Sequence, residues 1–146
     1  NIMRNGWYLI PVTLIAILLP LFISVGRAVE PRIFPVITPP GLILTSNQPT
    51  DDGRRIIYTE FTKDRECEFL TLKWFDQSGR EVGFEFREEL PDEFAGGLTR
   101  PLGEHEAGPW IVYSNNIDNT YSKSYHKCHP FWTTVSTVFV GKNIIL

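Results

Sequence analysis

The longest apolar stretch of the chain runs from Trp7 to Val25 and contains no charged residue. At a rise of about 1.5 Å per residue, about 20 apolar residues in a helix cross a hydrocarbon layer of about 30 Å. The stretch therefore predicts one transmembrane helix, and residues 1–28 are expected to form an N-terminal membrane anchor. Pro11 and Pro20 each remove a backbone hydrogen bond, so a bend is expected near one of them.

Polar and aromatic side chains bracket the predicted span. Arg4, Trp7 and Tyr8 lie at one end and Arg27 lies at the other. Amphipathic rings and arginines favour the membrane–water interface, so these four residues are predicted to be interface residues. Basic residues occur on both sides of the span, and the positive-inside rule therefore does not set the orientation.

Two other interpretations of the same stretch stay open. Gly26-Arg27-Ala28 resembles the small-x-small end of a secretory signal, with cleavage after Ala28. Because the stretch is apolar all round, it also fits a helix buried by neighbouring subunits in an assembly such as a virus particle.

Prolines dominate the next segment. Pro31, Pro35, Pro39 and Pro40 fall within ten residues. Proline disfavours helix at the residue before it and favours extended, polyproline-like chain. Residues 29–41 are therefore predicted to be an extended stalk that lifts the following domain off the membrane.

From residue 42 to 146, apolar and polar residues alternate with a period of two. Val82, Phe84 and Phe86 alternate with charged residues, as in a strand with one buried and one wet face. Similar short runs alternate with turn signals, which predicts an all-β domain, an immunoglobulin-like β-sandwich of about seven strands. The other predicted strands are Leu42–Thr45, Ile56–Thr62, Cys67–Phe75, Trp110–Tyr113, Tyr121–Cys128 and Trp132–Val140, with a long loop over Glu88–Gly108. On the third run, Leu70, Leu72 and Trp74 are expected on one face.

Cys67 and Cys128 are the only cysteines. Each lies in a predicted strand, and in a sandwich such a pair is expected to form a disulfide that bridges the two sheets. Disulfides persist in oxidising compartments, so the β domain is predicted to lie outside the cytoplasm. Two departures from antibody domains limit the likeness to architecture: Trp74 follows Cys67 closely, and His126 occupies the tyrosine-corner position. Two unrelated thiols in a cytosolic domain are the alternative.

Charge narrows the range of partners. The part from Glu30 onward carries all 17 acidic and 12 of the 14 basic residues, a net charge of −5. Nucleic-acid phosphates attract clustered lysine and arginine, so nucleic acid is not an expected partner.

Candidate chemistry is sparse, and neither a catalytic residue nor a cofactor is predicted. His105, His126, Cys128 and His129 do not form a convergent metal-ligand set in a strand model, and a disulfide removes Cys128 as a thiolate. The acidic stretch Glu81–Glu93 lacks the spacing of a calcium loop. Signatures of serine nucleophiles, phosphate loops and dinucleotide binding are absent from the sequence, so no small-molecule substrate is expected.

A polar stretch between two predicted strands is the candidate binding loop. It contains Asn115, Asn116 and Asp118 and is followed by Tyr121. Asparagine-rich loops beside tyrosines are common protein-recognition surfaces.

Four motifs resemble those of small single-pass membrane proteins of tailed bacteriophages and proteobacteria, with a disulfide-linked β-sandwich ectodomain. They are Phe61–Cys67, Arg100–Gly103, Gly108–Trp110 and His126–Thr133. The resemblance covers the stalk and most of the domain. It implies a phage-related membrane or virion component and supplies no catalytic residue.

The expected function is a membrane-anchored, non-enzymatic binding or structural module of a phage or bacterial envelope. Its partners are the lipid bilayer and other protein subunits. The alternatives are a virion component with a protein-buried helix, a lysis or envelope-remodelling factor, and a metal-dependent or thiol enzyme.

Overall fold

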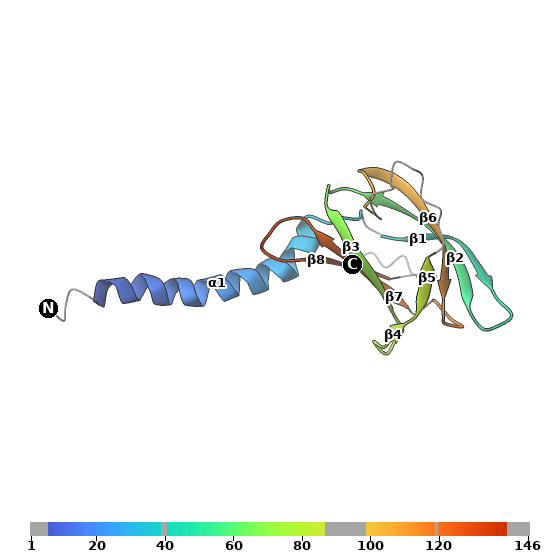
Figure 1. The fold of residues 1–146 in the computed structure, drawn as a ribbon, viewed down its shortest axis with the longest axis horizontal. Coiled ribbons are helices and arrows are strands. Elements are labelled where there is room, and N and C mark those ends of the chain that lie inside the picture. Colours follow the sequence, from blue (N-terminus) through green and yellow to red (C-terminus); the bar gives the residue numbers. More distant parts are fainter. Residues whose placement is uncertain (1–5, 39–40, 87–98, 119, 140–146) are drawn as a thin grey trace.

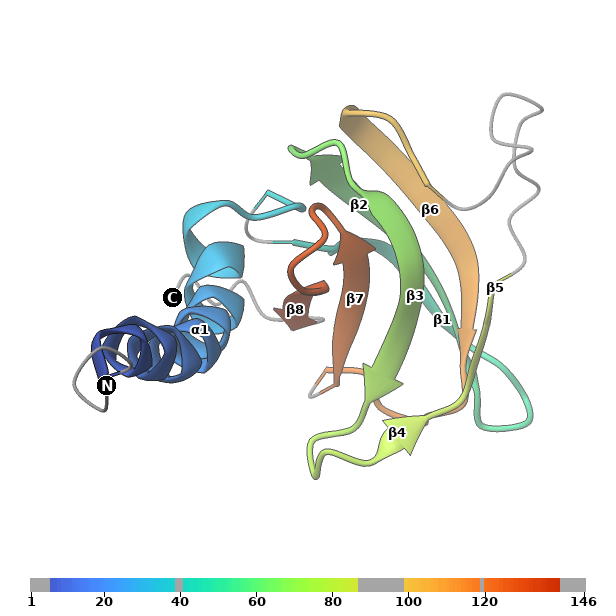
Figure 2. The same cartoon turned by 60° about the vertical axis from the view of Figure 1, so that its left-hand side comes forward.

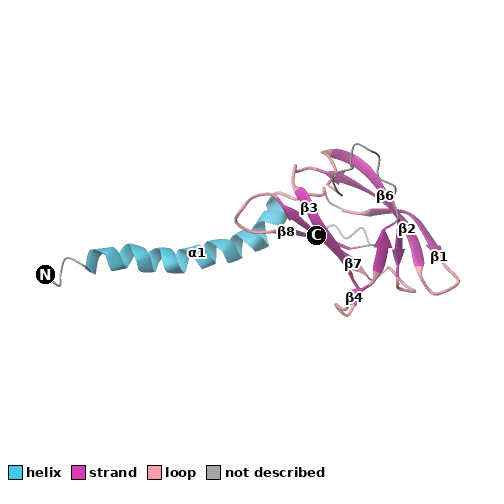
Figure 3. Cartoon of the chain, in the orientation of Figure 1, coloured by secondary structure: helices cyan, strands magenta, loops and turns pink. Residues whose placement is uncertain are grey.

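The structure is a computed structural model that describes residues 6–38, 41–86, 99–118 and 120–139. A single long helix projects from a domain made of β-strands (Figure 1, Figure 3). Within the described residues no helix follows residue 41. The mostly β domain and the preceding apolar helix agree with the prediction.

Helix α1 spans Gly6–Ile33 and contains Pro11, Pro20 and Pro31. None of its residues is buried, and apolar side chains are exposed on all of its faces. Within the described part of the chain, it is the one helix long and apolar enough to cross a membrane. It ends eight residues beyond the predicted span, which reached Val25.

The predicted stalk of residues 29–41 is wrong in its first part and in its role. Residues up to Ile33 are helical, so Pro31 lies inside the helix. The chain then packs onto the domain: Val36 is fully buried, its carbonyl accepts a hydrogen bond from the Asp64 amide, and the Thr38 amide donates to the Thr62 carbonyl. These tertiary contacts hold the domain close to the helix end. Pro39 and Pro40 lie outside the described residues.

In the described parts of the chain, eight strands form two four-stranded antiparallel sheets (Figure 2). One sheet has the order β1-β2-β6-β5 and the other β4-β3-β7-β8. The strands are β1 Ile43–Pro49, β2 Arg55–Lys63, β3 Glu68–Phe75, β4 Glu81–Val82, β5 Phe84–Phe86, β6 Gly103–Val112, β7 Tyr121–Lys127 and β8 Thr134–Phe139. The core between the sheets is centred on Ile57, Trp74, Trp110, Val112 and Ile117.

A bulge in β3 corrects the predicted buried face. The pairing of β3 with β7 shifts register between Phe69 and Thr71. An extra residue reverses the alternation of side chains, so Leu70 is 46% exposed although Trp74 is buried. The neighbouring Phe69 ring instead packs against the His126 ring in a T-shaped arrangement, with centroids 5.5 Å apart.

Strand β6 begins inside the predicted loop Glu88–Gly108. Gly108 and Pro109 argue against a strand by sequence, yet they lie within it. The register with β2 shifts at this point, so Tyr58 lies opposite both residues, and bulges are where sheets accept proline. Gly108 has a φ of 141°, and a Cβ there would approach the Ile57 carbonyl oxygen to 3.0 Å.

The Cys67–Cys128 disulfide is confirmed, with the two Cα atoms 4.5 Å apart. It does not bridge the two sheets as predicted. Cys67 immediately precedes Glu68 and Cys128 immediately follows Lys127, and these two neighbours are paired in the β3–β7 ladder. The disulfide therefore closes one end of a single sheet.

Candidate functional site

The most connected polar group of the described chain lies where the helix meets the domain. The Glu30 carboxylate, in the last turn of α1, accepts hydrogen bonds from four side chains. Arg65 Nη1 and His129 Nε2 each lie 2.9 Å from Oε1, Thr134 Oγ1 lies 3.2 Å from Oε2, and Trp132 Nε1 also donates to Oε2. We call these five residues the Glu30 junction.

Three parts of the domain supply the donors. Arg65 lies between β2 and β3, His129 and Trp132 lie in the loop between β7 and β8, and Thr134 begins β8. The Glu30 side chain is only 11% exposed, and the Arg65 guanidinium balances its charge. Arg65 also donates to the Phe34 carbonyl just beyond the helix. A carboxylate with its acceptor sites filled fixes the end of α1 relative to the β2–β3 connection and the β7–β8 loop.

The disulfide joins the two segments that carry Arg65 and His129 of the Glu30 junction. Cys67 follows Arg65 by two residues, and Cys128 immediately precedes His129. It therefore holds the two loops that supply the charged and aromatic donors.

Apolar packing continues the junction along the helix. The Trp132 ring lies over Gly26, where a Cβ would come within 2.3 Å of the indole. It also contacts the Phe22 ring edge-to-face, with centroids 5.7 Å apart, and the His129 ring at 4.6 Å. A larger residue at position 26 would force the indole ring to shift away from the helix.

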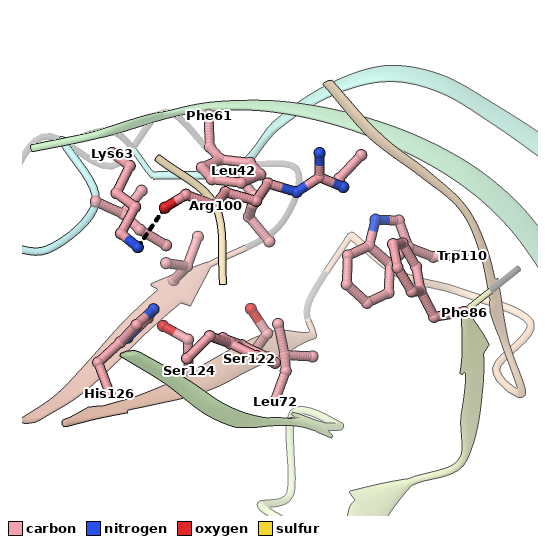
Figure 4. Close-up of a pocket in the computed structure, with 14 residues that line it drawn as sticks. Leu42, Phe61, Lys63, Leu72, Phe86, Arg100, Trp110, Ser122, Ser124 and His126 are labelled. Carbon is pink, nitrogen blue, oxygen red and sulfur yellow. Dashed lines mark hydrogen bonds between the residues drawn. The ribbon is translucent and has the colours of Figure 1, made fainter. Parts of the chain in front are cut away.

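A cavity of about 70 Å³ lies between the two sheets (Figure 4). Its polar wall is the inward face of β7, formed by Ser122, Ser124 and His126, which are all buried. The two hydroxyls and His126 Nδ1 have no hydrogen-bond partner within the described structure. The cavity has the volume of about two water molecules at about 30 Å³ each, far less than the about 300–1,000 Å³ of a typical ligand pocket.

One buried cation closes the same cavity. The Lys63 ammonium donates to the carbonyls of Cys67, at 2.8 Å, and Arg100 (Figure 4). Burial lowers the pKa of Lys63, and the nearby Glu66 carboxylate opposes that shift. Burial, reinforced by the positive charges of Lys63 and Arg65, lowers the pKa of His126 to about 4. His126 is therefore neutral in the folded protein near neutral pH.

This buried histidine predicts acid sensitivity. Between its ordinary pKa of 6.5 and about 4, the unfolded chain binds a proton at His126 that the folded chain does not. The free energy of unfolding should therefore fall as the pH decreases through this window, by about 2–3 kcal/mol between about pH 7.5 and about pH 4.5. Urea unfolding of the full chain in detergent micelles measures it. His126→Gln should flatten this part of the pH dependence, and an unchanged slope in that variant would contradict the assignment.

The residues of the predicted binding loop lie in the turn between β6 and β7. The Asn116 side chain accepts a hydrogen bond from the Asp118 amide at 2.9 Å, and the Asn115 carbonyl accepts one from Arg55 Nε at 3.0 Å. Tyr121 is the first residue of β7 and stacks on Phe75. The structure brings the three polar residues together and uses part of their hydrogen-bonding capacity within the fold.

The predicted interface residues lie on or before α1. Trp7 and Tyr8 are exposed at its start, and Arg27 is exposed about one turn before Glu30. Arg4 lies outside the described residues. Sequence reasoning missed the Glu30 junction, although one signal was present: Glu30 is the first acidic residue of the chain and lies five residues after Val25, the end of the apolar stretch.

Over the described residues, no three His, Cys, Asp or Glu side chains gather as a metal-binding group. No family model matches this chain, and neither a curated protein nor a solved structure matches it.

Proposed function

We propose that this chain is a single-span membrane protein that holds a β domain in a fixed position on the oxidising side of the membrane. There the domain acts without catalysis, through contacts with other protein subunits. The observation that carries the proposal is the Glu30 junction, because it joins an exposed apolar helix rigidly to a folded domain.

The helix supports the membrane part of the proposal. Burying an apolar side chain of this size is worth roughly 1.5–3 kcal/mol, and the exposed apolar residues of α1 extend along its whole length. Such a surface requires lipid or partner subunits. Lipid is favoured because Trp7 and Arg27 bracket the span at bilayer spacing. The phage or bacterial envelope setting rests on the sequence resemblance.

The disulfide supports the placement of the domain. Thiols are kept reduced in most cytosols, whereas a disulfide persists in the periplasm or at the cell surface. Since α1 crosses once, the N-terminus then lies on the opposite side.

The strand order supports an immunoglobulin-like architecture. In that fold one sheet contains strands A, B, E and D and the other contains C, F and G. The orders β1-β2-β6-β5 and β4-β3-β7-β8 correspond to this arrangement, with β4 as an extra edge strand. Trp74 on β3 occupies the place of the buried tryptophan on strand C. The disulfide within one sheet is a departure from antibody domains.

Membrane fractionation tests the proposal. The full chain, expressed in bacteria, should stay in the membrane pellet after extraction with alkaline carbonate. Leu14→Arg combined with Leu18→Arg should reduce that recovery, because each arginine near the helix centre costs about 2.5–3.5 kcal/mol on insertion. Leu70→Arg, on the exposed face of β3, is the matched control and should change nothing. Recovery of the unaltered chain as a soluble monomer contradicts the span, and recovery only in lipid-free particles favours a virion component.

A further inference from the structure

We infer that the β7–β8 loop, residues 128–133, is a second membrane contact, and that it and the end of α1 form a groove for a phospholipid acyl chain. The inference rests on the proposed membrane span of α1. In this arrangement the β domain rests against the bilayer, whereas the sequence predicted a stalk that lifts it away.

The depth of the loop follows from what Trp132 touches. With Trp7 at one interface, about 20 helical residues reach the other interface near Arg27. Phe22 then lies about 7 Å deeper than Arg27, at about 1.5 Å per residue. Trp132 packs on both Gly26 and Phe22, so its ring lies at or below the level of Arg27. Tryptophan is the side chain that most favours this interfacial layer.

The surface around Trp132 is apolar and open. Phe131 is 68% exposed, and Phe34, just beyond the helix, is 62% exposed. A groove of about 830 Å³ runs between the helix and the loop, and Figures 1 and 2 both place the loop beside the end of α1. Leu18, Leu21 and Val25 on one side of the groove face Phe131 and Trp132 on the other.

The groove opens into the exposed apolar surface of α1, so whatever covers that surface also reaches the groove. Because lipid covers the surface of a membrane-spanning helix, lipid is the occupant. At its polar end the groove is lined by His129 and by the Glu30 carboxylate, which is enclosed by the junction donors. An apolar groove that is continuous with the surface of a membrane-spanning helix matches an acyl chain of the leaflet next to the domain.

Site-directed spin labelling of the full chain in phosphatidylcholine vesicles tests the inference. Single p-acetylphenylalanine residues carry the label, which leaves the disulfide intact. The labelled positions are Phe131, Phe34, the mid-helix Leu14 and Asp51 in the turn between β1 and β2. The measurement compares the accessibility of each label to oxygen, which partitions into lipid, and to a nickel chelate, which stays in water.

The label at position 131 should be more accessible to oxygen than to the chelate, as at position 14, and the label at position 51 should show the reverse. The label at position 34, seven residues outward of Arg27, should fall between them. If position 14 is lipid-exposed but position 131 behaves like position 51, the loop contact is refuted while the span stands. If position 14 also lacks lipid exposure, the proposed function itself fails. Dipolar broadening between labels at position 131 in undiluted samples, lost on dilution with unlabelled chain, would assign the groove to a second copy and overturn the lipid assignment.

Discussion

Replacing Cys67 and Cys128 together by alanine is expected to lower the free energy of unfolding of the β domain by about 4 kcal/mol. The bond closes a loop with a sequence separation of 61 residues. In the chain-entropy account, a loop of that size restricts the unfolded chain by about 4 kcal/mol at room temperature. Domains of this kind are stable by about 5–15 kcal/mol in total, so the loss is large.

Urea unfolding of the full chain in detergent micelles, followed by tryptophan fluorescence, measures the loss. The unaltered chain unfolded with a reducing agent present should show the same decrease, which separates the bond from the substitution. The pair Gln77→Ala and Thr137→Ala, two exposed positions, is a control for multiple substitution. A decrease below about 1 kcal/mol would mean that the β3–β7 ladder alone holds the strand ends.

The same reduction should loosen the junction. Arg65 and His129 lie next to the two cysteines, so the disulfide limits how far the two donor loops can separate. Stability and orientation of the domain are therefore coupled through one bond.

Glu30→Ala is expected to release the domain from the helix. Four donors lose their acceptor at once, including the Arg65 guanidinium, and removing one partner of a largely buried ion pair costs about 3–5 kcal/mol. Because the contacts join α1 to the domain, much of this loss should appear as freedom of orientation. Pulsed electron paramagnetic resonance between labels at Leu14 and Asp51 should show a distance distribution much broader than in the unaltered chain.

Two variants sharpen this test. Glu30→Gln keeps one acceptor oxygen but removes the charge, so its distribution should be intermediate. Glu60→Ala removes an exposed carboxylate on β2 and should leave the distribution unchanged. An equally narrow distribution and equal stability in Glu30→Ala would show that the packing of Trp132 on Gly26 alone sets the orientation.

Elements that depend on local interactions could be predicted from the sequence. The uncharged run from Trp7 to Val25 specified an exposed apolar helix, because no other structure buries every backbone group over such a length. A run rich in β-branched and aromatic residues, Ile56–Thr62, specified a strand. Two cysteines in a chain expected outside the cytoplasm specified their own pairing.

Local patterns failed where one extra residue or one distant contact decides the outcome. The bulge in β3 moves the Leu70 side chain to the exposed face of the sheet. The register shift opposite Gly108 and Pro109 allows these two residues, which usually interrupt strands, to lie within β6. Pro31 lies within the predicted stalk of residues 29–41, yet the helix continues through it, because Glu30 and Val36 on either side are held by the domain. The general preference of proline for non-helical chain does not include the stabilisation that these tertiary contacts provide.

The Glu30 junction was decided by tertiary structure alone. Glu30 is separated in sequence from Arg65 by 35 residues, from His129 by 99 and from Trp132 by 102. No periodicity of two or 3.6 residues links such positions. They meet because the disulfide closes the end of one sheet and Gly26 lets an indole ring lie against the helix, which places four donors around a single carboxylate.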